Sequence, residues 1–159
     1  MADEVVELAY TEARAALREQ ESALSNVRNR ATGLLAAATV GTSLSATAGL
    51  LNTDPDRGRV FPGWAGWILL LAVALIATGA LAVLWPAKAW SFGPSPSRLL
   101  SLAGTDVDAV RRAATTAMVA SIATNDRVLK RRLDAYRVTA VVLMLEIGVL
   151  VTTLIFVRR

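Results

Sequence analysis

The chain has 159 residues, about the size of one domain, but it is 54% hydrophobic and only 19% charged, which is unusually apolar for a soluble domain. It contains no Cys and no His, which excludes disulfide scaffolds, zinc sites built on Cys and His, Cys nucleophiles and Ser-His-Asp triads. The net charge of +4 would suit nucleic acid, but the positions of the basic residues indicate a membrane protein instead.

The first 30 residues are predicted to form a cytoplasmic amphipathic helix. Seam residues recur there at alternating intervals of three and four, as in a coiled coil, with Gln20 as the one polar member. The seam consists of Val6, Tyr10, Ala13, Leu17, Gln20, Leu24, Val27 and Ala31. Residues 2–51 contain no Pro and the first Gly is Gly33, so we expect one continuous helix from this arm into the apolar run that follows.

Three runs that are uncharged or nearly so are long enough to cross a bilayer, whose core of about 30 Å needs about 20 helical residues. They predict an all-α integral membrane protein with three transmembrane helices, in which two long cytoplasmic arms continue into the first and third spans. The predicted segments are the cytoplasmic helix 1–30, span 31–51, external loop 52–63, span 64–86, cytoplasmic loop 87–104, cytoplasmic helix 105–137 and span 138–157.

The three predicted spans differ in strength. The middle one is the most apolar, with Trp64 and Trp67 at one end and Trp85 and Trp90 at the other, which is typical of interfacial anchoring. Thr and Ser dilute the run at 31–51, and the alternative interpretation of that run is a buried helix of a soluble protein.

The loop before the second arm is predicted from the cluster Gly93-Pro94-Ser95-Pro96-Ser97, with a further turn around Gly104. Thr105 is then expected to be the N-cap of a helix that has Asp106 and Asp108 in its first turn. No Pro or Gly occurs between Thr105 and Gly148, so this arm is expected to run directly into the last span.

Both arms run toward the membrane, so we expect them to pack side by side as a parallel pair. The alternative is that each arm lies on the membrane surface, which the acidic start of the first arm disfavours on an anionic leaflet. Thirteen Lys and Arg residues fall on the side of the N-terminus and the middle segment and four on the other, which predicts a cytoplasmic N-terminus in a bacterial inner membrane.

Small residues recur every four positions along the first predicted span, which permits close approach of helices in lipid. These helix-packing candidates are Gly33, Ala37, Gly41, Ser45 and Gly49. One interpretation is self-association of the chain into an oligomer; the other is packing against the remaining spans of the same chain.

Glu146 is the ionisable residue inside a predicted span, where burial of a charge is costly unless it is paired or protonated. Thr139 and Thr153 lie seven residues to either side and share its face, and the same spacing picks out Asn125 and Arg132. This polar stripe must face other helices or water. Glu146 is interpreted either as a pore-lining or gating residue, or as a protonated carboxyl bonded to a Ser or Thr of the first span.

The remaining charged clusters have ordinary interpretations. Lys130, Arg131 and Arg132, with Arg127 and Arg137, fit a positive-inside anchor that also attracts anionic lipid. Arg111-Arg112 is weak support for an anionic ligand such as a nucleotide. We find no phosphate loop, metal-ligand cluster, paired carboxylates or nucleophile elbow, so no enzyme activity, metal or cofactor is predicted, and no nucleic-acid motif is present.

The segment Arg28-Asn29-Arg30-Ala31-Thr32-Gly33-Leu34-Leu35 and the group Asn125, Lys130 and Leu133 accompany a layout that resembles a bacterial effector family. This family is the Pycsar transmembrane effectors and the related SLATT-type proteins of antiphage defence. The resemblance implies an oligomer that responds to a cyclic nucleotide from a partner cyclase and impairs the inner membrane. It carries over no ligand-binding residues, which stay unknown.

The sequence therefore favours a non-enzymatic, oligomeric membrane effector whose cytoplasmic helices sense a signal. Three alternatives stay open at this point: a docking subunit of a membrane complex, a holin-like lysis protein, and a small transporter or channel subunit.

Overall fold

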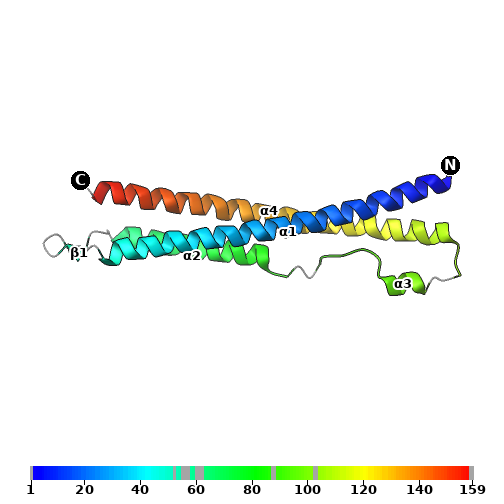
Figure 1. Ribbon diagram of the computed structural model, residues 1–159, viewed down its shortest axis with the longest axis horizontal. Helices are drawn as coiled ribbons and strands as arrows, with labels where there is room; N and C mark the ends of the chain where they lie inside the picture. The colour runs from blue at the N-terminus through cyan, green and yellow to red at the C-terminus, as the bar shows by residue number, and fades with distance from the viewer. Residues whose placement is uncertain are drawn as a thin grey trace. The chain divides into compact units, whose positions relative to one another are not determined.

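The computed structural model describes residues 2–51, 53–54, 58–59, 63–86, 89–101 and 104–157. The described chain is all-α in character, as the sequence predicts, with four helices and one two-residue strand pair. The elements are α1 (Ala2–Leu51), β1 (Thr53–Asp54), β2 (Gly58–Arg59), α2 (Gly63–Leu84), α3 (Pro96–Leu100) and α4 (Val107–Val157) (Figure 1). The strands pair antiparallel, Thr53 with Arg59 and Asp54 with Gly58.

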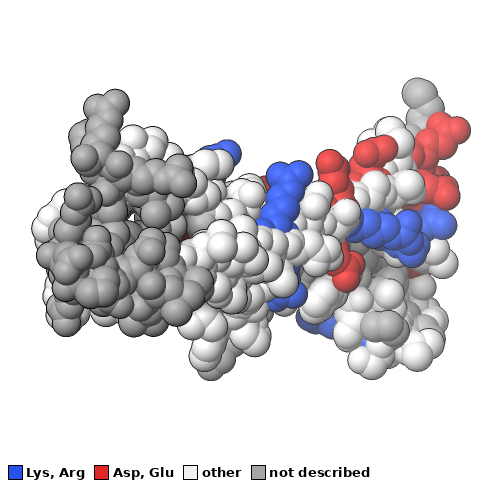
Figure 2. Space-filling view, turned by 60° about the vertical axis from the view of Figure 1, so that its left-hand side comes forward, with Lys and Arg blue, Asp and Glu red and all other residues white. Residues whose placement is uncertain are grey.

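The chain divides into two compact units, and α1 and α4 contribute to both. The first unit holds residues 1–26 and 86–131, and the second holds residues 27–85 and 132–159. Acidic side chains gather on the first unit on the face that Figure 2 shows, and this unit contains most of the Asp and Glu residues of the chain.

In the first unit, α1 and α4 pack as a parallel pair. Glu7 of α1 lies near Arg111 of α4, at 3.9 Å between carboxylate oxygen and guanidinium nitrogen. Further along both helices, Gln20 bonds Asp126. Because both contacts advance in the same direction along the two helices, the arms are parallel, as the sequence analysis expects.

In the second unit, α2 runs antiparallel to α4. Arg132 meets the last turn of α2 at Val83, and Thr139 meets Gly79, so the contacts move backward along α2 as they advance along α4. The helices α1, α2 and α4 all contribute to the core of this unit. Its buried cluster is Ala38, Ile76 and Leu143, with Leu34 and Val142 packed against it.

The seam predicted on the N-terminal arm is the face of α1 that packs inside the chain. Its members from Ala13 onward are buried or half-buried, and Val6 and Tyr10 are half-buried. The uninterrupted helix expected from the lack of Pro is also present, since α1 extends over 50 residues.

The start of α4 corrects one expectation. Asp106, rather than Thr105, is the N-cap, because its carboxylate accepts the backbone N–H of Ala109 at 3.2 Å and its carbonyl accepts that of Val110. An Asp side chain one residue later competes successfully with the Thr hydroxyl for the free N–H groups of the first turn. From there α4 continues for 51 residues without a break.

A short helix, α3, lies within the segment expected to be a loop. Ser95 caps it through its hydroxyl, which accepts the N–H of Arg98, and Pro96 occupies its first turn. Ser95 followed by Pro96 is a typical helix start, with Ser at the N-cap and Pro in the first turn. The surrounding Gly, Pro and Ser residues instead favoured the prediction of a loop. Gly93 and Gly104 on either side of this helix have positive φ angles of 99° and 98°, which accounts for Gly at both turns.

Two helices of the described chain are long and apolar enough to cross a membrane. They are Trp64–Leu84, which is nearly the whole of α2, and Val107–Thr153 of α4. α1 is not one of them, and the side chains of residues 45–51 lie outside the described part of the chain.

Candidate functional site

A ladder of polar side chains runs along the buried face of α4. It consists of Asn125, Arg132, Thr139, Glu146 and Thr153, at the seven-residue spacing noted in the sequence, and their exposed fractions lie between 0% and 8%. A polar group without access to water needs a partner, so each position of the ladder must be accounted for. Asn125 belongs to the first unit and the other four belong to the second.

Asn125 clamps the segment that precedes α3. Its Oδ1 accepts the backbone N–H of Ser91 at 3.1 Å, and its Nδ2 donates to the carbonyl of Ser91 at 2.9 Å. The Ser91 hydroxyl also lies 2.9 Å from that of Ser121 on α4. A residue of the loop is thereby tied to α4 by three hydrogen bonds.

Gln20 is the matching polar residue in the seam of α1. Its Nε2 donates to the carboxylate of Asp126 at 2.5 Å and to the carbonyl of Ile122 at 3.1 Å. One polar pair of this kind in an apolar seam fixes the register of two helices, because a shift would leave the buried amide nitrogen unpaired, whereas Oε1 has no hydrogen-bond partner in the described part of the chain.

Arg132 caps the C-terminal end of α2. Its two guanidinium NH groups donate to the carbonyls of Val83, at 2.7 Å, and of Trp85. α2 has no basic residue in its own last turn, so Arg132 supplies both the missing donors and the positive charge that this helix end favours. Burial, and then the positive charge of Arg28, lower the pKa of Arg132. Arg132 therefore has a structural role that its exposed neighbour Arg131 does not share.

Thr139 of α4 lies close to Gly79 of α2. A Cβ added to Gly79 would overlap the Thr139 hydroxyl, so the close approach depends on the glycine. The Thr139 hydroxyl itself donates to the carbonyl of Ala135, one turn back in α4, at 2.8 Å. The Thr153 hydroxyl donates likewise to Val149 at 2.7 Å.

Glu146 differs from the rest of the ladder. It is 2% exposed, and neither of its carboxyl oxygens has a hydrogen-bond partner in the described part of the chain. Thr39 and Thr42 of α1 donate to carbonyls of their own helix. The bond from a hydroxyl of the first span that the sequence analysis allowed for is thus not formed by the residues that the structure describes.

The small-residue stripe does not lie in the core of the second unit. Gly33 and Ala37 are exposed, and a Cβ built on Gly33 or Gly41 would meet no heavy atom within 4 Å. Packing of α1 inside the chain instead uses the neighbouring face, with Ala31 and Ala38. The structure therefore gives no support for intrachain packing at Gly33 and Ala37, while Ser45 and Gly49 lie outside the residues whose side chains are described.

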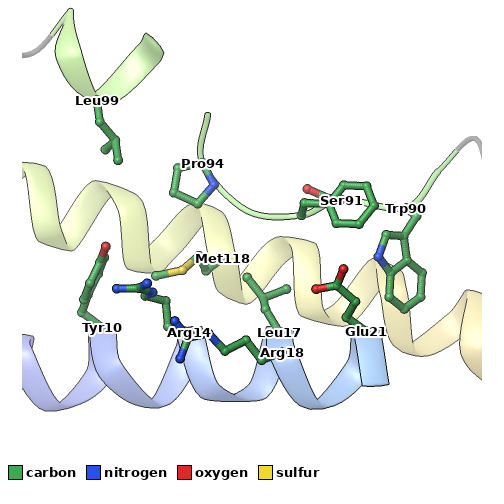
Figure 3. Close-up of a pocket in the computed structure, with 11 residues that line it drawn as sticks. Tyr10, Arg14, Leu17, Arg18, Glu21, Trp90, Ser91, Pro94, Leu99 and Met118 are labelled. Carbon is green, nitrogen blue, oxygen red and sulfur yellow. The ribbon is translucent and has the colours of Figure 1, made fainter. Parts of the chain in front are cut away.

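The first unit contains a pocket that the sequence analysis missed. It has a volume of about 300 Å³ and lies between α1, α4 and the segment before α3 (Figure 3). It is lined by Tyr10, Arg14, Leu17, Arg18, Glu21, Trp90, Ser91, Phe92, Pro94, Leu99 and Met118. No sequence spacing relates positions 10–21 to positions 90–99, because the loop brings them together, so there was no periodic signal to find.

Arg111, singled out in the sequence as a weak anion-binding candidate, is engaged within the chain. Its guanidinium pairs with Asp108 at 3.6 Å as well as with Glu7. Among the residues with described placement, no group of three or more acidic side chains could hold a metal ion.

Comparison with known proteins identified no relative: no protein-family model, no curated protein and no solved structure matches this chain.

Proposed function

We propose that this chain is a non-enzymatic, oligomeric protein of the bacterial inner membrane that impairs membrane integrity in response to a cytoplasmic signal. The observation that carries the proposal is Glu146, a buried carboxyl without a partner, in a helix that is long and apolar enough to cross a bilayer. An intramembrane ionisable group of this kind is expensive to keep and is characteristic of functional positions.

The proposed topology has three spans, at 31–51, 64–86 and 138–157, with the N-terminus and residues 87–137 in the cytoplasm. The charge distribution supports this orientation. α1 enters the proposal as a span because it packs with α2 and α4 around the same apolar core, at Ala38, Ile76 and Leu143. In this arrangement Arg132 lies at the cytoplasmic end of α2.

Oligomerisation is proposed to use the stripe that begins at Gly33 and Ala37. Small residues on an exposed face of a lipid-embedded helix permit close contact with a second helix. The chain has no native Cys, so single cysteines report on this contact without background. Cross-linking between copies is expected for Ala37→Cys. It is not expected for Thr39→Cys, because Thr39 is also exposed but points about 200° away from Ala37 around the helix axis.

The signal is proposed, from the resemblance alone, to be a cyclic nucleotide supplied by a partner cyclase. The test is entry of a membrane-impermeant dye into cells during controlled expression, with and without a co-expressed nucleotide cyclase. Entry that requires the cyclase, and that Glu146→Gln abolishes, is the expected result. Met144→Leu on the exposed face of α4 serves as the matched control and is expected to behave as the native chain does.

Two other outcomes would contradict the proposal. Dye entry without the cyclase would favour a holin-like protein or a constitutive channel. No entry in either case, with the protein shown to be in the membrane, would favour a docking subunit of a larger complex.

A further inference from the structure

We infer that the pocket of the first unit binds a small phosphorylated compound with a planar ring, the chemistry of a mononucleotide. The inference rests on the proposed function only in treating the pocket as the receptor for the cytoplasmic signal. The binding itself depends on the lining residues of this pocket and can be tested without any membrane assay.

The pocket offers two cations for a phosphate group. Arg14 and Arg18 both line it from α1. A spacing of four residues places them on the same side of the helix, with their Cβ atoms about 5–6 Å apart. Neither forms an ion pair within the described chain, whereas Arg111 and Arg137 do. Two unpaired guanidinium groups side by side suit an anion with several acceptor oxygens, since each can donate a planar pair of N–H groups.

Aromatic side chains line the same pocket as these cations. Tyr10 lines the pocket from α1, and Trp90 and Phe92 line it from the segment before α3. Phe92 is 77% exposed, so the chain holds a large apolar ring in contact with water. Exposed aromatic rings provide stacking surfaces for planar ligands, and nucleobases stack on such rings without a requirement for a particular base.

A carboxylate completes the lining. Glu21 lies at the end of the pocket near Trp90, while Tyr10 and Leu99 lie at the other end (Figure 3). A carboxylate accepts hydrogen bonds and repels anions, so it favours a ligand with a hydroxyl or amino group at some distance from its phosphate. A simple inorganic anion lacks such a donor group and the ring.

The wall that carries the aromatic residues is held in place. Asn125 bonds both backbone groups of Ser91, the residue between Trp90 and Phe92. Gly93 follows with a positive φ angle, and a Cβ there would approach the Leu17 side chain to 3.3 Å. The segment is therefore anchored to α4 and lies close against α1, which keeps the two aromatic residues in the lining of the pocket that also contains the two arginines.

A phosphate group could also come from a lipid headgroup. In the proposed topology, Arg18 precedes the first span by 13 residues, which is about 20 Å of helix. A headgroup at the bilayer surface would lie well away from the pocket. The volume of about 300 Å³ also falls at the small end of the range for small-molecule sites. We therefore assign a soluble ligand to this pocket.

The test is isothermal titration calorimetry on the full chain in detergent. The probes are 3′,5′-cyclic and 5′-mononucleotides of each base, the matching nucleosides, inorganic phosphate, and phosphatidylglycerol added to the detergent micelles as competitor. We expect saturable binding of at least one nucleotide, with phosphate alone and nucleosides alone binding at least tenfold more weakly. Arg14→Gln, Arg18→Gln and Trp90→Leu are each expected to weaken binding about tenfold or more. Arg112→Gln, an exposed arginine of α4 that does not line the pocket, is expected to leave it unchanged.

The inference is overturned if no mononucleotide binds, if phosphate alone binds as well, or if the three pocket variants bind as the native chain does. Competition by phosphatidylglycerol in the micelles would identify a lipid headgroup as the occupant and overturn the assignment of a soluble ligand. Nucleotide binding that depends on Arg14 and Arg18 but produces no dye entry would leave the pocket established and refute the proposed membrane function.

Discussion

The side chain of Asn125 satisfies both backbone polar groups of Ser91, accepting the N–H at 3.1 Å and donating to the carbonyl at 2.9 Å. Asn125 is fully buried, and Ser91 lies 34 residues earlier in a segment without regular structure. A side-chain amide presents one acceptor and one donor in the arrangement that a strand neighbour would offer. Asn125 thus forms with Ser91 the two backbone hydrogen bonds that a neighbouring strand would form.

We expect Asn125→Asp to loosen the segment around Ser91. The carboxylate would still accept from the N–H of Ser91 but would face the carbonyl with an oxygen in place of the donor. The free energy of unfolding is expected to fall by about 1–3 kcal/mol, the cost of leaving a buried polar group unpaired. Limited proteolysis between residues 86 and 101 should become faster. Asn26→Asp, an exposed change of the same kind on α1, should alter neither quantity. Equal proteolysis of the two variants would show that other contacts hold the segment.

The contact between Gly79 and Thr139 can be tested by single and double substitutions, because its two residues can be changed separately. Gly79→Ala would place a methyl group on the Thr139 hydroxyl and is expected to destabilise the second unit by about 1–3 kcal/mol, as overpacking does. Thr139→Ala in the same chain removes the overlapping hydroxyl and should restore most of the loss. Thermal unfolding in detergent, followed by circular dichroism, measures both effects.

Gly66→Ala is the control for this pair. Gly66 lies in the same helix, and a Cβ there meets no heavy atom within 4 Å. It should be neutral or raise stability by up to about 1 kcal/mol, since Ala favours a helix more than Gly does. If Gly79→Ala behaves like Gly66→Ala, the two helices do not approach as closely as the structure places them.

Replacement of Arg132 is expected to lower the free energy of unfolding by a large amount, unlike replacement of its neighbour Arg131. Arg132→Gln removes the charge and the fork that serves the carbonyls of Val83 and Trp85. The loss should be about 3 kcal/mol, the contribution of two charge-assisted hydrogen bonds, and amide hydrogen exchange should rise in the last turn of α2. Arg132→Lys keeps the charge but not the planar fork, so an intermediate effect is expected. The exposed neighbour variant Arg131→Gln should change stability by less than about 0.5 kcal/mol. Similar results for Arg131→Gln and Arg132→Gln would exclude the capping role.

Periodicity made the helices and their inner faces predictable. The three-four seam of the N-terminal arm identified the buried side of α1, and the seven-residue stripe identified the buried polar positions of α4, including Asn125 and Arg132. Both patterns are repeated many times, so no single residue decides them. Single-residue features were less predictable: the N-cap of α4 falls on Asp106 and not on Thr105, since local competition between side chains sets a helix start.

Contacts across the loop before α3 could not be derived in this way. The partner of Asn125, and the position of Trp90 in the same pocket as Arg14 and Arg18, depend on where an irregular segment returns to the helices. No period in the sequence encodes that return. The small-residue stripe was visible in the sequence, but its spacing did not show what the stripe contacts. It identified a face of α1 without revealing that Gly33 and Ala37 lie away from the core of the chain.

Glu146 allows stability and function to be separated. Its carboxyl is buried without a partner in the described chain, so the folded chain bears a desolvation cost that an apolar side chain of similar length would not bear. Glu146→Met is therefore expected to leave the free energy of unfolding unchanged or to raise it by about 1–3 kcal/mol. The same variant should abolish dye entry, because the polar group proposed for the membrane assembly is gone. Leu143→Met, a buried apolar change one turn earlier in α4, should lose less than about 1.5 kcal/mol and keep dye entry. A clear loss of stability in Glu146→Met would mean that the carboxyl has a stabilising partner within the fold, and retained dye entry would remove Glu146 from the proposed mechanism.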